Sequence, residues 1–308
     1  MIGFGRWRAA LVATLALVAV LPARAEQISV THWGVLMYGV PFAVAMDRGL
    51  FKQAGVDVDG ILTSKGGGTT VRNVLAGGLP YGEVALSAAV AAANQGIDIK
   101  IVNAGVPTVG EILWVTCPAR RSRRSRTWRA RRSRHEPEIG HRDGAHHGAR
   151  QSRDEARRGR AHRDRRHRLR PDGAAAGRRA GAPIMDPIWA KDSAKYRVLF
   201  YAKDLLPKMT QTVGITTSEF IKSNPDKLKA IIAGRRAGVD YLYAHPQESG
   251  AILAQAYNLD PAIAEISVRN AIDIHYWTPG AIDRAGLEAM VQGLRLIGDV
   301  EGPVDWAS

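Results

Sequence analysis

The sequence predicts an α/β fold built around an open sheet. Short apolar runs typical of buried strands alternate with helical segments between Gln27 and Thr116, and regular elements return after Pro183. With 308 residues, 45% of them hydrophobic, the chain can build the core of one large domain or two medium domains. Its single cysteine excludes a disulfide framework and a Cys-rich metal site, and a multi-pass membrane protein is excluded by the lack of further spanning runs.

The first half of the chain reads as a series of strand and helix pairs. Each strand is a nearly continuous apolar run, Gly55 ends the first helix, and the glycine loop Lys65–Gly68 leads into the second. The predicted strands are Ile28–Trp33, Val56–Leu62, Glu83–Ser87, Ile99–Asn103 and Ile112–Thr116, and the predicted helices are Pro41–Ala54, Thr69–Ala76 and Ala88–Gln95.

The second half is predicted to hold two strands, Tyr196–Tyr201 and Thr210–Thr216, followed by helices. Three sites place a capping side chain before a proline, which favours a helix start, namely Asn224-Pro225, Asp260-Pro261 and Thr278-Pro279. The predicted helices are Lys227–Ala237, Ala262–Asn270 and a last one in which Ile282, Leu287, Met290, Val291, Leu294 and Ile297 keep helical spacing up to Gly298.

The net positive charge of the chain comes from one block of residues. Residues Pro118–Ala182 contain 22 Arg, no Lys and 7 acidic residues, so the formal charge of +14 becomes −1 without them. This block has only three large apolar residues, Trp128, Ile139 and Leu169, and it holds six of the nine His. Such a composition cannot form a packed core.

The N-terminus has the pattern of a secretory signal. Arg6 and Arg8 precede an apolar run from Ala9 to Leu21, and Ala23-Arg24-Ala25 follows. We expect cleavage after Ala25 and a periplasmic location. No cysteine stands at the cleavage point, which argues against a lipid anchor.

Two stretches carry a resemblance to a known family. The string GVPFAVAMDRGLFKQAGVDVDGILTSKGGGTTVRNVLAGG (Gly39 to Gly78) and the helices of Asn224–Gly234 and Tyr243–Asp260 resemble extracytoplasmic solute-binding proteins of ABC importers. The most similar group binds alkanesulfonates, taurine, nitrate and thiamine pyrimidine precursors. The resemblance implies a two-lobed periplasmic-binding-protein-like fold (type II), with the solute in the cleft between the lobes.

The implied division of the chain follows from this resemblance. Residues 1–25 are the signal peptide, 26–116 the first part of lobe 1, and 117–182 the Arg-rich segment in place of most of lobe 2. Residues 183–216 are a remnant of lobe 2, and 217–308 are helices that return to lobe 1.

The candidate ligand-binding residues follow strand ends, where an open α/β sheet binds its ligand. The glycine loop also exposes backbone N–H groups at a helix start, which favours an anion, although a plain turn is an alternative. Trp33 and Tyr38 could equally pack between elements, and Asp186 and Trp189 belong to the site only by analogy with the family. The expected set is Trp33, Tyr38, Lys65, Gly67, Gly68, Thr69, Thr70, Ser87, Asp186 and Trp189.

Three interpretations of the Arg-rich segment compete. A basic arm for nucleic acid would be expected to mix Lys with Arg, and a metal tract would need regular His spacing. The favoured interpretation is translation in a shifted frame. Shifted codons allowed for Cys117–Ser133 can encode PGAPFKTVKDLAGKKIA, which is similar to the family where lobe 2 begins. We expect single-base slips near Thr116, Arg134 and Arg179, and a loss of tight solute binding if they are real.

The expected function is capture of a small polar or anionic organic solute for an importer, with a permease and an ATPase as partners. The chain is expected to act as a monomer that meets the membrane only through its permease, without cofactor, metal or nucleic acid. The alternatives are a pyrimidine-precursor synthase-like enzyme of the same fold and a secreted binder of nucleic acid or anionic surfaces. Outside the Arg-rich segment only His32, His245 and His275 remain, and no catalytic spacing emerges, so the chain is not expected to be an enzyme.

Overall fold

A five-stranded sheet forms the centre of the computed structural model, which describes residues 25–116 and 181–306. In spatial order its strands are β2 (Val58–Ser64), β1 (Glu26–Thr31), β3 (Gly82–Ala85), β8 (Thr212–Thr216) and β4 (Lys100–Val106). β1 pairs in parallel with β2 and β3, whereas β8 runs antiparallel to β3 and β4. The carboxyl ends of β1 to β4 therefore share one edge, and the prediction of an open α/β sheet is confirmed.

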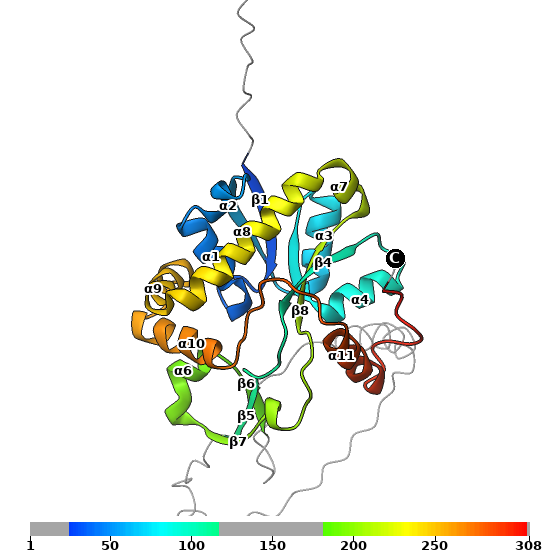
Figure 1. The fold of residues 1–308 in the computed structure, drawn as a ribbon. Helices are drawn as coiled ribbons and strands as arrows, with labels where there is room; N and C mark the ends of the chain where they lie inside the picture. The colour runs from blue at the N-terminus through cyan, green and yellow to red at the C-terminus, as the bar shows by residue number, and fades with distance from the viewer. Residues whose placement is uncertain (1–24, 117–180, 307–308) are drawn as a thin grey trace, which may run out of the picture.

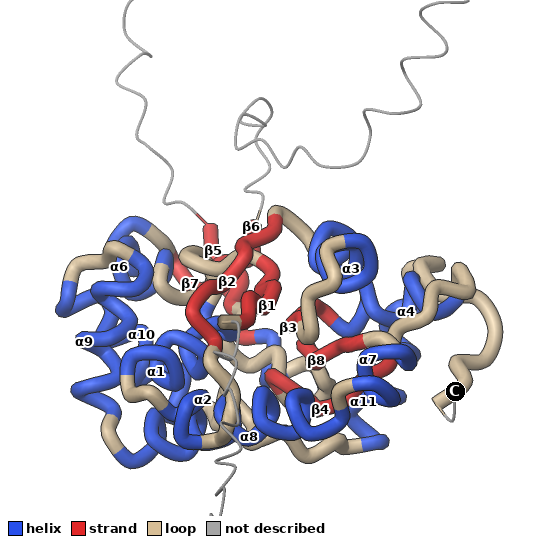
Figure 2. The backbone as a smooth tube through the Cα atoms, turned by 90° about the horizontal axis from the view of Figure 1, so that it is seen from above, coloured by secondary structure: helices blue, strands red, loops and turns tan. Residues whose placement is uncertain are grey.

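Helices cover both faces of this sheet (Figure 2). In β1 the apolar Ile28 and Val30 join one core, while Ser29 points the other way and accepts a hydrogen bond from Asn73. The helices of the first core are α1 (Val40–Asp47), α2 (Leu50–Gln53), α8 (Pro225–Ala244), α9 (Pro246–Tyr257) and α10 (Pro261–Asp273). Those of the second core are α3 (Gly67–Ala76), α4 (Leu86–Asn94) and α11 (Arg284–Leu296). Two short helices, η1 (Met37–Gly39) and α7 (Ser218–Ser223), precede α1 and α8.

A smaller, three-stranded sheet lies below the main body in Figure 1. Its order is β6 (Ala182–Ile184), β5 (Leu113–Thr116) and β7 (Arg197–Tyr201), all antiparallel. The short helices α6 (Ile188–Asp192), η2 (Ser193–Lys195) and η3 (Ala202–Asp204) flank it. We call the large sheet with its helices the first lobe and this small sheet with α6, η2 and η3 the second lobe.

Two segments of chain connect the lobes. One runs from β4 to β5 and the other from η3 to β8, and they are hydrogen bonded to each other near both ends. The Gln211 amide N–H donates to the Val106 carbonyl at 2.7 Å, and the Ala202 amide N–H donates to the Ile112 carbonyl at 2.9 Å. These bonds fix the start of the second lobe relative to the large sheet.

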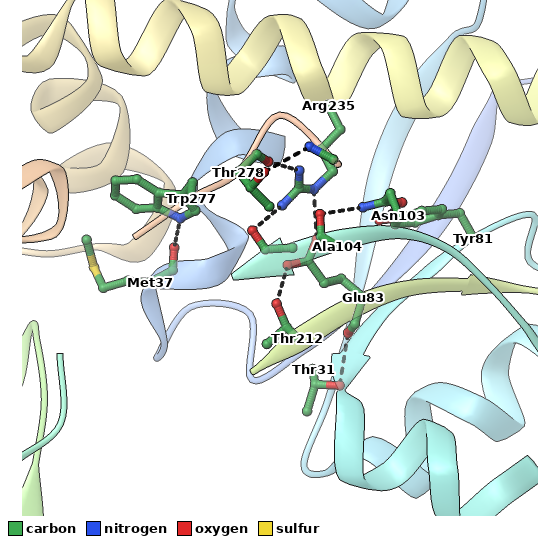
Figure 3. A network of polar contacts seen from close by, with 12 residues as sticks. Thr31, Met37, Tyr81, Glu83, Asn103, Ala104, Thr212, Arg235, Trp277 and Thr278 are labelled. Atoms are coloured by element: carbon green, nitrogen blue, oxygen red, sulfur yellow. Dashed lines mark hydrogen bonds and ion pairs between the residues drawn. The ribbon is translucent and has the colours of Figure 1, made fainter. Parts of the chain in front are cut away.

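A buried ion pair holds the first lobe together (Figure 3). Arg235 of α8 lies 2.9 Å from the Glu83 carboxylate of β3, and the two side chains are 1% and 0% exposed. The guanidinium also donates to the carbonyls of Gly105 and Thr278, while the Thr212 hydroxyl donates to Glu83. The network thus joins α8, three strands of the sheet and the segment that follows α10.

Three sequence predictions are wrong in detail. The segment predicted as one helix, Pro41–Ala54, is divided into α1 and α2, because Gly49 adopts a left-handed φ of 64°. Thr278-Pro279 starts no helix, since the backbone of Thr278 bonds to Gly105 and Arg235, and α11 begins after Asp283.

The third correction concerns a boundary between lobes. Residues Thr212–Thr216 were expected at the end of the second-lobe remnant, but β8 lies between β3 and β4 in the large sheet. The chain therefore returns to the first lobe before this strand rather than after it.

Two expectations lie outside the described residues, the signal peptide and almost all of the Arg-rich segment. Among the helices that the structure does describe, none is both long and apolar enough to cross a membrane.

Candidate ligand-binding site

A cavity of about 260 Å³ lies where the two lobes meet. The first lobe contributes the start of η1 and the end of α10 with the residues after it, and the connecting segment from β4 to β5 contributes Gly110 and Glu111. The second lobe contributes the start of β5, the start of α6, the end of β7 and η3. The lining residues are Met37, Gly110, Glu111, Leu113, Asp186, Trp189, Tyr201, Lys203, Asn270, Ala271, Asp273, Ile274 and Tyr276.

Glu111 is the most perturbed acidic group of this cavity. Its Oε1 accepts a hydrogen bond of 2.6 Å from the Gln211 side chain, whereas Oε2 is buried without a hydrogen-bond partner among the described residues. Burial raises the pKa of the Glu111 carboxyl to about 7, which the bond from Gln211 opposes and the charge of Asp186 reinforces. Near neutral pH the Glu111 carboxyl group is therefore partly protonated and partly ionised.

Asp186 is the second buried carboxyl of the cavity. The Ala190 amide donates to Oδ1 and the Asn270 side chain donates to Oδ2, both at 2.9 Å. Burial raises the pKa of Asp186, although the two hydrogen bonds lower it. The bond to Asn270 also joins the second lobe to α10 of the first lobe.

Aromatic side chains line much of the rest of the cavity, namely Trp189, Tyr201 and Tyr276. The Lys203 ammonium lies 5.5 Å from the centre of the Tyr201 ring, a cation–π contact at the exposed rim. Tyr276 is buried, and burial raises the pKa of its phenol well above the ordinary value. Flat apolar walls with a few polar groups are typical of small-molecule sites.

Two of the predicted ligand-binding residues, Asp186 and Trp189, line this cavity. Trp33 and Tyr38 instead pack within the first lobe. The Trp33 ring meets Tyr257 edge to face with centroids 5.1 Å apart, and Tyr38 is buried, which raises the pKa of its phenol. Their contact with a ligand stays a prediction.

The glycine loop has a structural role in the first lobe. Thr70 is fully buried, and its hydroxyl lies 2.5 Å from that of Thr31 and 2.6 Å from that of Ser64, so it joins α3 to β1 and β2. A Cβ atom on Gly67 would overlap the side chain of Ala88, so glycine lets α3 approach α4 closely.

The other predicted residues lie near the strand ends without lining the cavity. Lys65 and Gly68 are exposed, and Thr69 and Ser87 are half-buried. Thr69 accepts a hydrogen bond from Arg72. Anion binding at this loop stays a prediction.

Sequence reasoning missed the cavity residues Glu111, Tyr201, Lys203, Asn270 and Tyr276. Glu111 gave one available signal, because it is a lone acid in an otherwise apolar and glycine-rich stretch just before a strand. The others carry no local pattern. Among the described residues, no group of three or more His, Cys, Asp or Glu could hold a metal ion.

The sequence also matches a family model. Residues 37–114 and 176–249 match the family described as NMT1/THI5 like. The match covers parts of both lobes, including the first half of β5 and all of α6 and α8. The cavity residues from Met37 to Lys203 lie within it, and those from Asn270 onward lie outside it. No curated protein matched the chain by sequence.

Solved structures share the fold of this chain. The alkanesulfonate-binding protein SsuA from Xanthomonas axonopodis pv. citri, bound to MOPS, has a TM-score of 0.56 at 14% identity and covers 89% of this chain and 93% of its own. The periplasmic aliphatic sulphonate binding protein SsuA from Escherichia coli has a TM-score of 0.54 at 13% identity, covering 88% and 84%.

A third structure is the ligand binding component of an ABC-type import system from Staphylococcus aureus, with zinc bound. Its TM-score is 0.59 at 13% identity, and it covers 91% of this chain and 94% of its own. The prediction of a periplasmic-binding-protein-like fold is confirmed.

Proposed function

We propose that this protein is the solute-binding component of an ABC importer and acts outside the cytoplasm. The observation that carries the proposal is the cavity between the lobes, lined by the buried carboxyl group of Asp186, the half-buried one of Glu111 and three aromatic rings. The match to the NMT1/THI5-like family model and the fold shared with importer components support it. Its partners would be a membrane permease and an ATPase.

The position of the cavity explains how binding would act. A solute there would touch Met37 and Tyr276 of the first lobe, Glu111 of the connecting segment, and Asp186 and Trp189 of the second lobe. Contacts to both lobes stabilise the arrangement in which they are close together, which a permease can distinguish from the empty protein. The buried groups position a solute without any covalent step, so we infer a binding protein rather than an enzyme.

The small sheet supports the proposal of a damaged second lobe. On the face away from the cavity, Trp114 and Phe200 stack with centroids 5.7 Å apart and remain 36% and 37% exposed. The sequence between β5 and β6 is the Arg-rich segment, which has too few apolar residues to cover this face. We expect the printed chain to bind its solute more weakly than a chain with the reading frame restored.

Thermal-shift and calorimetric titration of the purified full chain with a panel of small polar solutes tests the function. At least one solute should stabilise the frame-restored chain, and stabilise the printed chain less or not at all. W189A in the frame-restored chain should lose this effect. W114A is the matched control, because Trp114 lies in the same lobe but does not line the cavity. If no solute stabilises either the printed or the frame-restored chain, the proposal is wrong.

A further inference from the structure

The charges around the cavity are predominantly negative. Glu111, Asp186 and Asp273 line it, and Lys203 is the one lining residue with a basic side chain among the described residues. Lys203 is exposed, and its ammonium group is already in contact with the Tyr201 ring. An anion in the cavity would therefore lie among three acidic side chains, with one exposed ammonium group to offset them.

One oxygen of this group of acids has no partner. Glu111 Oε2 has almost no solvent-exposed surface and accepts no hydrogen bond from a described residue, while Oε1 is held by Gln211. A buried acceptor without a donor is costly, and since Glu111 lines the cavity, a ligand that supplied a donor to this carboxyl group would relieve the cost. A charged N–H donor satisfies the oxygen and also offsets the repulsion between Glu111 and Asp186.

We infer that the cavity selects an organic cation, an ammonium or amidinium group on a flat or apolar body, with the charged nitrogen at Glu111 and Asp186. The aromatic rings of Trp189, Tyr201 and Tyr276 would contact the body of the ligand. This inference rests on the proposed function and names its solute class. It also departs from the anionic ligand expected from the glycine loop, which does not line the cavity.

The ionisation of Glu111 determines how the affinity for a cation should change with pH. The titratable groups that line the cavity with it are Asp186, Asp273, Lys203, Tyr201 and Tyr276, and the Tyr38 phenol is also close enough to interact with its charge. Since burial raises the pKa of Glu111 to about 7, a cation should bind better as the pH rises and release protons on binding. Between about pH 6 and about pH 8 the ionised fraction of such a group, and with it cation affinity, rises about tenfold.

Three probes of similar shape and different charge test the inference on the full chain, namely benzamidine, benzamide and benzenesulfonate. Calorimetry in two buffers of different ionisation enthalpy measures both affinity and proton release. Benzamidine should bind at least about tenfold more tightly than benzamide, because charge-assisted bonds exceed neutral ones. Benzenesulfonate should bind most weakly of the three.

Two variants separate charge recognition from folding. E111Q keeps the shape and the Oε1 acceptor, so it should lose about tenfold in benzamidine affinity together with proton release, and keep its affinity for benzamide. D186N should also lower benzamidine affinity. E219Q is the matched control, because Glu219 is an exposed acid of α7 that does not line the cavity.

The outcomes distinguish this inference from the function on which it rests. Preferred binding of benzenesulfonate, or benzamidine affinity that E111Q leaves unchanged, overturns the cation assignment and leaves solute binding standing. Failure of all three probes, while another solute of the panel binds, also overturns the assignment alone. If no solute of any charge binds either the printed or the frame-restored chain, both the assignment and the proposed function are wrong.

Discussion

The Arg235–Glu83 ion pair allows a quantitative test of the packing of the first lobe. Both side chains are buried, and the guanidinium Nε lies 2.9 Å from the Glu83 carboxylate. Removing one partner of such a pair leaves an uncompensated buried charge, which costs about 3–5 kcal/mol. Because domains of this kind have a total stability of about 5–15 kcal/mol, E83Q should lower the free energy of unfolding by a large fraction.

R235M should be similarly costly, because it leaves the buried Glu83 carboxylate without the guanidinium that lies 2.9 Å away.

Urea unfolding followed by circular dichroism measures these changes. The control is K229M on the same helix, since Lys229 and Asp226 form an ion pair that is 77% and 94% exposed and worth less than about 1 kcal/mol. If E83Q were no more destabilising than K229M, the hydrogen bonds to the carbonyls of Gly105 and Thr278 would be enough to stabilise the buried guanidinium of Arg235. The expected cost of a buried charge without its ion-pair partner would then be refuted.

Three further predictions concern single positions. Because the pKa of Glu111 is raised in the folded state, the native chain should lose up to about 3 kcal/mol of stability as the pH rises from 4.5 to about 7. E111Q should abolish this loss in pH-dependent unfolding, and identical pH profiles of the two chains would contradict the raised pKa. G234A should destabilise by about 1–3 kcal/mol, since its Cβ would overlap the Phe51 ring. G293A, which meets no described atom within 4 Å, should instead stabilise slightly, and equal effects in thermal unfolding would contradict this packing. D260A should cost about 1 kcal/mol, because Asp260 caps the first amides of α10, and an unchanged urea midpoint would argue against the cap.

Local patterns were sufficient to predict most elements of the first lobe. The strands are apolar runs whose neighbours in the sequence are helices, and the cap at Asp260 depends only on residues within one turn. Asp260-Pro261 and Thr278-Pro279 have the same pattern, yet only the first starts a helix. The difference is tertiary, since the backbone of Thr278 is held by Gly105 and Arg235. A sequence window cannot contain those partners.

The site was predictable only in part for the same reason. Asp186 and Trp189 were reached through a resemblance, whereas Glu111 and Asn270 come from segments far apart in the chain and carry no shared spacing. The glycine loop has the sequence of an anion site, but its glycine at position 67 is needed for the contact between α3 and α4. The same glycine-rich pattern can therefore serve either helix packing or anion binding. Which of the two it serves depends on the residues that surround it in space.

The whole chain has a net positive charge, whereas the cavity is lined mainly by acidic residues. The charge of the cavity should govern binding. The excess of positive charge lies in the Arg-rich segment, while the cavity is lined by three acids and one lysine among the described residues. At physiological ionic strength, charges beyond about 8 Å are largely screened in water, whereas buried carboxyl groups act at short range. If the Arg-rich segment is translated in a shifted frame, as we propose, restoring the frame would remove most of the arginines and complete the second lobe. It should therefore raise the affinity for the solute without reversing the charge that the cavity prefers.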